Sequence, residues 1–267
     1  MSRLYASTGD GIARLDASDG AWTVVTSLRG SGAQCLAVDP RDADVVYAGL
    51  RAGGVRRTSD GGRSWVDCRL PAPGVFSLAV SAVDGAVYAG TEPSALFRSD
   101  DGGASWQDHR PGAQRDVHSL AWHPREERRA YEAGGGGAAW SDDGGETWQP
   151  ADTGRDRHYT WAVAVEPDDP DAWYVSASTG PFAAHGGADP QARIYAWRGR
   201  VWRALTGGLP EPLPAMPYAL VANDGRLFAG LADGQLWESS DRGESWHACA
   251  LEGDALKRLN ALVVAPG

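Results

Sequence analysis

The sequence is poor in cysteine and has no long hydrophobic run, and each shortage excludes a class of protein. Its three cysteines show neither paired nor metal-type spacing, which indicates free thiols in a reducing compartment rather than a disulfide framework. No run of 18 apolar residues would span a membrane, and the first residues lack the basic and apolar regions of a signal peptide. We therefore expect a cytoplasmic protein that binds no membrane.

Positive charge is also scarce. The chain has 25 Lys and Arg against 35 Asp and Glu, a formal net charge of −10, and Lys257 is its single lysine. Non-specific binding to nucleic acid or to anionic lipid needs a basic face, so we expect no nucleic-acid partner. A length of 267 residues with 42% hydrophobic content suffices for one large core, and we predict a single domain over residues 1–267.

What the sequence has in abundance is glycine, tryptophan and one repeated octapeptide. The pattern S/T-x-D-x-G-x-S/T-W occurs four times, at residues 58–65, 99–106, 141–148 and 239–246. Its aspartates are Asp60, Asp101, Asp143 and Asp241. This pattern resembles the Asp box, so the chain resembles the BNR (Asp-box) repeat β-propellers, a group that includes sialidase-like proteins and repeat proteins named glycosyl hydrolases. The resemblance implies a scaffold that is used by enzymes and by binding proteins alike.

The spacing of the repeat predicts the number of blades. The box tryptophans are 41 or 42 residues apart, and a final gap of 98 residues holds two units. Trp22 and Trp202 mark degenerate copies, so the count is six units of four short strands. In the second of these repeats we predict strands at 35–38, 45–48, 55–58 and 64–67. The sequence thus predicts an all-β, six-bladed β-propeller with four-stranded antiparallel blades, in which the N- and C-terminal strands complete one blade together.

The Asp boxes have a structural and a functional interpretation. A turn aspartate accepts hydrogen bonds from nearby backbone N–H groups, and the glycine three residues before the tryptophan is free to adopt positive φ. The alternative makes the four aspartates catalytic acids or calcium ligands. We favour the structural interpretation, because turn carboxylates are normally satisfied locally.

A candidate ligand face follows from aligning the first strands of the six units. By the resemblance, this face is formed by the loops that join the fourth strand to the next first strand and the second strand to the third. The alignment places six residues at one position: Gln34, Phe76, His118, Trp161, Tyr218 and Asn260. Aromatic faces with polar groups between them suit a sugar-like ligand, although the rings could instead only fill the interior.

The loops around these positions supply further candidates. The insertion at 178–190 places His185 between small residues and is expected to form a lid. The candidate ligand-binding residues are Arg115, Asp116, His118, Arg157, His158, Tyr159, Trp161, His185, Tyr218 and Arg258. We expect no cofactor and no metal, although His118, His158 and His185 could meet in space.

Three carboxylates are candidate catalytic groups: Glu132, Asp116 and Asp156. Glu132 occupies a position that is apolar in the other blades, where burial would raise the pKa of its carboxyl and suit it to general acid catalysis. The favoured alternative is a salt bridge from Glu132 to an arginine such as Arg115 or Arg157, or a place at an exposed strand end.

The expected function is that of a monomeric binding scaffold, whose ligand is a carbohydrate-like small molecule or a partner protein. By the resemblance, this ligand is expected in the central funnel, on the face opposite the Asp boxes. The alternative is a glycoside hydrolase of sialidase-like or xyloglucanase-like type. The sialidases that this chain resembles use three arginines, a Tyr–Glu pair and an aspartate. This chain lacks their Arg-Ile-Pro segment, and no Tyr–Glu pair is assigned in it. Binding is therefore the preferred expectation.

Overall fold

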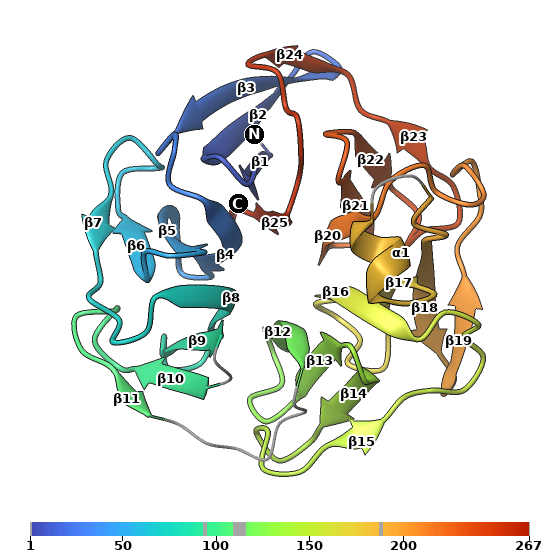
Figure 1. Ribbon diagram of the computed structural model, residues 1–267, viewed down its shortest axis with the longest axis horizontal. Helices are drawn as coiled ribbons and strands as arrows, with labels where there is room; N and C mark the ends of the chain where they lie inside the picture. Colours follow the sequence, from blue (N-terminus) through green and yellow to red (C-terminus); the bar gives the residue numbers. More distant parts are fainter. Residues whose placement is uncertain (1, 93–94, 109–115, 187–188, 267) are drawn as a thin grey trace. The chain divides into compact units, whose positions relative to one another are not determined.

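The computed structural model describes residues 2–92, 95–108, 116–186 and 189–266. The chain forms two compact units, Met1–Pro111 with Cys249–Gly267, and Gly112–Ala248. Each unit contains three β-sheets (Figure 1). The expected single domain over 1–267 stays a prediction.

The first unit holds the N-terminal blades and the C-terminal strands. Its first sheet has the order β24 (Leu251–Gly253), β3 (Ala21–Ser27), β2 (Ile12–Ser18), β1 (Arg3–Ser7) and β25 (Ala261–Val264). The second sheet has the order β4 (Ala33–Asp39), β5 (Asp42–Leu50), β6 (Val55–Thr58) and β7 (Val66–Asp67). The third sheet has the order β8 (Gly74–Val80), β9 (Val87–Glu92), β10 (Ala95–Ser99) and β11 (Gln107–Asp108).

The second unit holds three further sheets and the helix that the structure describes. The sheets are β12 (Val117–Trp122), β13 (Ala130–Gly134), β14 (Gly137–Ser141) and β15 (Gln149–Pro150); β16 (Tyr159–Val165), β17 (Trp173–Ser178), β18 (Arg193–Arg198) and β19 (Val201–Ala204); and β20 (Pro217–Asn223), β21 (Arg226–Leu231), β22 (Leu236–Ser239) and β23 (His247–Ala248). Helix α1 (Pro181–His185) follows β17. Five of the six sheets have four strands and one has five, which confirms the predicted all-β, six-bladed propeller.

One blade joins the two ends of the chain, as predicted. β1 pairs with β25 in antiparallel register, with Leu4 opposite Val264 and Ala6 opposite Leu262. β24 adds a fifth strand, which runs parallel to β3. It pairs with Trp22, Thr23 and Val24 and thus shortens the exposed edge of this sheet, which limits pairing with another chain.

The Asp boxes are turn clamps in all four copies. In the second box, Ser99 Oγ donates to Asp101 Oδ1 at 2.8 Å, and the Ser105 N–H donates to the same oxygen at 2.8 Å. The Ser105 hydroxyl donates to Asp101 Oδ2, and Gly103, at φ 90°, donates its N–H to Ser99 Oγ. The same bonds recur at Asp60, Asp143 and Asp241. In each box the aspartate carboxylate accepts its hydrogen bonds from its own turn, as the structural interpretation predicts.

The predicted strand at 64–67 was too long by two residues. Ser64 and Trp65 belong to the box turn, and β7 begins only at Val66. The reason is that the Ser64 N–H donates to Asp60 Oδ1, which makes it unavailable for the strand ladder.

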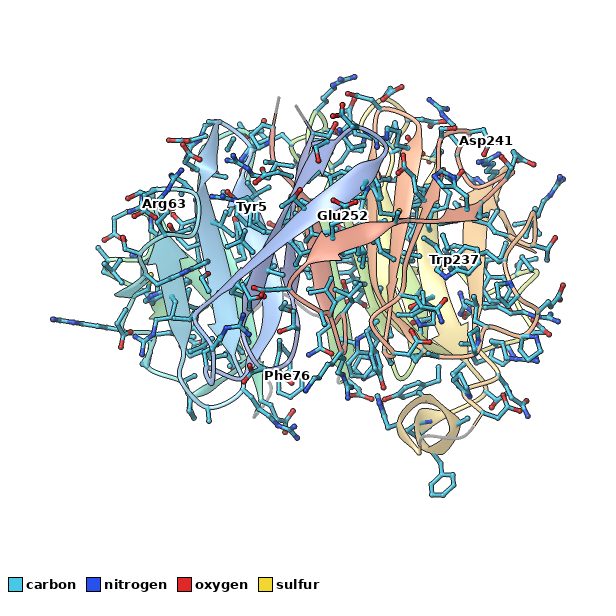
Figure 2. All side chains as sticks on the ribbon, turned by 90° about the horizontal axis from the view of Figure 1, so that it is seen from above. Tyr5, Arg63, Phe76, Trp237, Asp241 and Glu252 are labelled. Carbon is cyan, nitrogen blue, oxygen red and sulfur yellow. The ribbon has the colours of Figure 1, made fainter. Side chains whose placement is uncertain are left out.

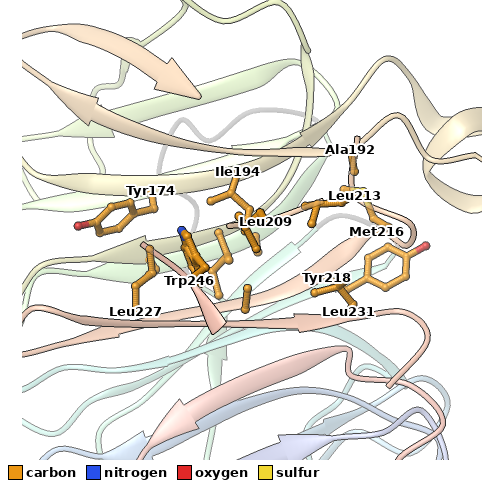
Figure 3. Close-up of a cluster of buried hydrophobic side chains, with 14 of the residues drawn as sticks. Tyr174, Ala192, Ile194, Leu209, Leu213, Met216, Tyr218, Leu227, Leu231 and Trp246 are labelled. Atoms are coloured by element: carbon orange, nitrogen blue, oxygen red, sulfur yellow. The ribbon is translucent and has the colours of Figure 1, made fainter. Parts of the chain in front are cut away.

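A hydrophobic cluster fills the space between the last two sheets of the second unit (Figure 3). It includes Ile194 from β18, Leu227 from β21 and the box tryptophan Trp246. In Figure 3, Tyr174 lies at one end of the cluster and Tyr218 at the other. The packed interior thus connects the Asp-box end of these blades with the opposite end. Within the described residues, no helix is long and apolar enough to cross a membrane.

The clamps predict a specific dependence of stability on pH. Hydrogen bonds, above all from the Ser105 hydroxyl, lower the pKa of Asp101 to about 2, against about 3.9 for an aspartate in an unfolded chain. A folded pKa below the unfolded one means that the carboxylate stabilises the fold above about pH 4 and loses this effect as the pH falls toward 2. Asp101→Asn should therefore lower the melting temperature at neutral pH and flatten its decline between about pH 4 and pH 2.

The matched control is Asp100→Asn, because Asp100 pairs with Arg98 at 2.8 Å instead of clamping the turn. Thermal unfolding followed by circular dichroism across this pH range checks the prediction. An unchanged acid decline in Asp101→Asn would show that the clamp is not coupled to stability.

Candidate functional site

The residues that the sequence aligned at one position of the first strands share a structural feature. In five sheets, the ladder between the innermost strand and its neighbour skips a residue there. For example, Val117 is opposite Gly134 and Ser119 is opposite Ala133, which leaves out His118. The skipped residues are Gln34, Phe76, His118, Trp161 together with Ala162, and Tyr218. Such β-bulges redirect a side chain away from the regular alternation of a strand.

In the second unit, three bulge residues come together. His118 from β12 stacks on Trp161 from β16, with ring centroids 4.2 Å apart and planes 25° apart. Trp161 contacts Tyr218 from β20 edge to face, with centroids 5.1 Å apart. The ring centroid of Tyr159 lies 5.0 Å from that of His118, and the ring centroid of His185 lies 4.8 Å from that of Trp161. These five residues are called the ring cluster below. All five were predicted as ligand-binding residues from the sequence.

The predicted lid is a short helix that is fixed to the ring cluster by hydrogen bonds. His185, the last residue of α1, has its Nδ1 2.9 Å from the Tyr218 hydroxyl and its Nε2 3.0 Å from the Tyr159 hydroxyl. Tyr218 also donates its proton to the Ala184 carbonyl at 2.8 Å. Figure 2 shows α1 at the end of the second unit opposite to Asp241 of an Asp box. The ring cluster therefore lies at the end of these blades that is remote from the Asp boxes.

The direction of each hydrogen bond in the ring cluster follows from the carbonyl groups at its two ends. Because the Tyr218 proton goes to Ala184, His185 donates from Nδ1 to Tyr218. A neutral His185 then accepts at Nε2 from Tyr159. Burial raises the pKa of Tyr159 to about 12, so this hydroxyl keeps its proton at neutral pH. His118 donates from Nδ1 to the Thr160 carbonyl at 2.8 Å.

Asp116 adds a carboxylate to the ring cluster. Its Oδ1 lies 3.3 Å from His118 Nε2; the Asp116 side chain is 66% exposed, whereas that of His118 is only 8% exposed. Gly135 donates its N–H to the Asp116 carbonyl at 2.9 Å. A Cβ at Gly135 would come within 2.0 Å of Asp116 Oδ2, so the carboxylate can take this position only because residue 135 is a glycine.

Thr160 is a supporting residue that the sequence analysis missed. Its buried hydroxyl accepts from the Gly134 N–H at 2.9 Å and donates to the Gly137 carbonyl at 2.6 Å. It thereby ties the start of β16 to the turn between β13 and β14, which carries Gly135. The signal for this bond was the run of glycines at 134–137, which leaves backbone groups open to a neighbouring hydroxyl.

Three other predicted residues lie outside the contacts of the ring cluster. Asp156 accepts hydrogen bonds from Tyr195, Arg157 and Arg193, and the Tyr195 hydroxyl is the main group that lowers its pKa. Arg157 also donates to the Gln191 carbonyl at 2.9 Å. His158 is exposed to solvent. Asp156 and Arg157 thus stabilise the segment that immediately precedes β16 through ion pairs.

The remaining candidates are placed separately. Glu132 is 1% exposed on β13, opposite Leu120 and Ala139, so its expected burial is confirmed. Arg258 belongs to the first unit, where its Nε donates to Asn260 Oδ1 at 2.7 Å. Arg115 lies outside the described residues.

Across the described ranges, no three or more His, Cys, Asp or Glu side chains are grouped so that they could hold a metal ion. His118 and His185 do lie in one cluster, but each of their four ring nitrogens lies within hydrogen-bond distance of Thr160, Tyr159 or Tyr218.

Comparison with known proteins identifies the repeat. The family model described as BNR/Asp-box repeat matches residues 139–150, which contain the whole third box. The chain is thus a six-bladed β-propeller in which one segment matches the BNR/Asp-box repeat. No curated protein sequence matches this propeller.

Solved structures with the same fold include enzymes and a recognition complex. The GH74 xyloglucanase from Xanthomonas campestris superposes with a TM-score of 0.64 and 22% identity, over 92% of this chain and 43% of that one. The GH74 enzyme of Niastella koreensis gives 0.68 and 17%, with the same coverage. A chain of the nidogen/laminin complex gives 0.74 and 12%, over 99% of this chain and 98% of that one. The Asp-box propeller thus spans less than half of the two GH74 chains, and these likenesses show the fold alone.

The bond between Thr160 and the glycine turn gives a test of the site's construction. Thr160→Val keeps the shape of the side chain but leaves the buried Gly134 N–H and the Gly137 carbonyl without their partner. The free energy of unfolding should fall by about 1–3 kcal/mol. Urea unfolding measures the loss, with Thr153→Val at an exposed position as the control. Equal stability of the two variants would contradict the assigned bond.

Proposed function

We propose that this propeller is a binding protein and that its site is the ring cluster. The observation that carries the proposal is the convergence of five ring side chains from three blades and α1. Tyr159 and Trp161 are only partly buried, so part of each ring remains accessible to a ligand. Rings of this kind stack on apolar faces, while the imidazole, hydroxyl and carboxylate groups beside them bind polar ones.

The proposed ligand is a carbohydrate-like small molecule. A sugar ring has apolar C–H faces and a rim of hydroxyl groups, which match the aromatic faces and the polar atoms of the ring cluster. The fold is also the one found in the GH74 xyloglucanase, an enzyme whose name states a carbohydrate substrate. That likeness is support by analogy, because fold alone does not determine ligand.

Binding is favoured over hydrolysis by the placement of the carboxylates. A glycoside hydrolase needs two carboxyl groups about 5–9.5 Å apart across the sugar. Of the three candidates, only Asp116 contacts the ring cluster. Asp156 is bound by Tyr195 and two arginines. Glu132, the third candidate, is buried on β13.

A partner protein is the second candidate ligand, and one observation favours it. Phe182 on α1 is 90% exposed, and it lies three residues before His185 of the ring cluster. An exposed large apolar side chain beside a site suits insertion into a partner. A protein ligand would therefore depend on Phe182, whereas a small carbohydrate would not.

Binding of a glycan library, measured by isothermal titration calorimetry, tests the proposal. Trp161→Ala should weaken the affinity for a bound glycan more than about tenfold, because it removes the central ring. The control is Trp237→Ala on β22, whose Nε1 donates to Gln235 Oε1 outside the ring cluster. This variant should bind like the unmodified protein.

Three outcomes would redirect the proposal. An affinity unchanged in Trp161→Ala would place the ligand elsewhere, and release of reducing sugar that is lost in Asp116→Asn would make the protein a hydrolase. If no glycan binds, loss of protein capture in Phe182→Ser would identify a partner protein as the ligand.

A further inference from the structure

At the Tyr159 hydroxyl, one hydrogen-bonding proton is available for two neighbouring acceptor nitrogens. The Tyr159 hydroxyl lies between two imidazole nitrogens, 3.0 Å from His185 Nε2 and 3.4 Å from His118 Nε2. It has one proton and gives it to the nearer nitrogen. His118 already uses its Nδ1 proton on the Thr160 carbonyl, so in the neutral ring its Nε2 bears a lone pair.

Three acceptors therefore face one another around His118 Nε2. In the part of the chain that the structure describes, the polar atoms near this nitrogen are Tyr159 Oη and Asp116 Oδ1. The first has given its proton away, and the second is a carboxylate oxygen. The His118 side chain is more than nine-tenths buried, and a buried polar atom without a hydrogen-bond donor is unfavourable. With His118 neutral, no described group at this position both donates a hydrogen bond and carries positive charge.

The surrounding groups favour a cation at this position. Asp116 is exposed enough to meet a ligand from solvent. Trp161, Tyr159 and Tyr218 present ring faces or edges within the same cluster, and aromatic faces attract organic cations. The net charge of −10 draws a cationic ligand toward the protein.

We propose that the ligand of the ring cluster carries a protonated amino group, which donates hydrogen bonds to Asp116 Oδ1, His118 Nε2 and Tyr159 Oη. This inference rests on the proposed function and narrows its ligand to a carbohydrate-like molecule with a primary ammonium group. An ammonium ion has three donors and no acceptor, so it matches three acceptors without leaving one unpaired. A neutral hydroxyl donates only one hydrogen bond and leaves the Asp116 charge uncompensated.

A pair of glucosides that differ in one group tests the inference. Calorimetry at about pH 8, above the ordinary titration range of imidazole, compares 2-aminoethyl β-D-glucoside with 2-hydroxyethyl β-D-glucoside. The amine should bind at least about tenfold more tightly, through a cation–π contact and a charge-assisted bond to Asp116. Asp116→Asn should reduce this preference about tenfold, whereas Asp152→Asn, at an exposed carboxylate that pairs with Arg155, should retain it.

The outcomes separate this inference from the proposed function. Equal affinity for both glucosides would overturn the ammonium ligand while leaving a carbohydrate site in place. Binding of cyclohexylamine at Asp116 without binding of either glucoside would support the ammonium group and overturn the carbohydrate. If none of the three compounds binds, both the ammonium group and the carbohydrate site are contradicted. Circular dichroism of Asp116→Asn establishes that the variant is folded.

Discussion

A bulge near the start of the innermost strand is the constraint on which the candidate site depends. In a regular strand, alternation places residues i and i+2 on one face, so the residue before the core positions would point between blades. The skipped position in β12 frees His118 from the ladder, while Ser119 and Leu120 keep their register with Ala133 and Glu132. One inserted residue thus lets the His118 side chain change direction while the rest of the strand keeps its packing in the blade.

The two ends of the second unit are stabilised by different means. At one end, each box aspartate accepts hydrogen bonds from its own turn, so the clamp is local in sequence. At the other end, the bonds join segments that are distant in sequence: His118 to Thr160, Tyr159 to His185, and His185 to Tyr218. The local clamps can form in any blade with the octapeptide, whereas the ring cluster exists only once its blades are packed. This difference explains why the repeated motif identifies a scaffold and the non-repeated residues identify a site.

The sequence predicted the parts of this structure that repeat. Four copies of the octapeptide and two degenerate ones predicted six blades. The sequence also aligned Gln34, Phe76 and Tyr218 at one position, but it did not predict that this position is a bulge. It could not predict contacts that depend on three-dimensional distance. The short helix α1, the bond from Thr160 to the glycine turn and the ion pairs of Asp156 with Arg157 and Arg193 all fall in this class. Ser64 and Trp65 were assigned to a strand because alternation alone does not show that the Asp60 carboxylate holds the Ser64 N–H.

A crystal structure of the protein grown above neutral pH with 2-aminoethyl β-D-glucoside tests the central claim most directly. We predict His118 stacked on Trp161, His185 between the hydroxyls of Tyr159 and Tyr218, and the amino nitrogen of the ligand within hydrogen-bond distance of Asp116 and His118. Rings that lie apart, or a ligand bound away from these residues, would contradict the assignment of the ring cluster as the binding site.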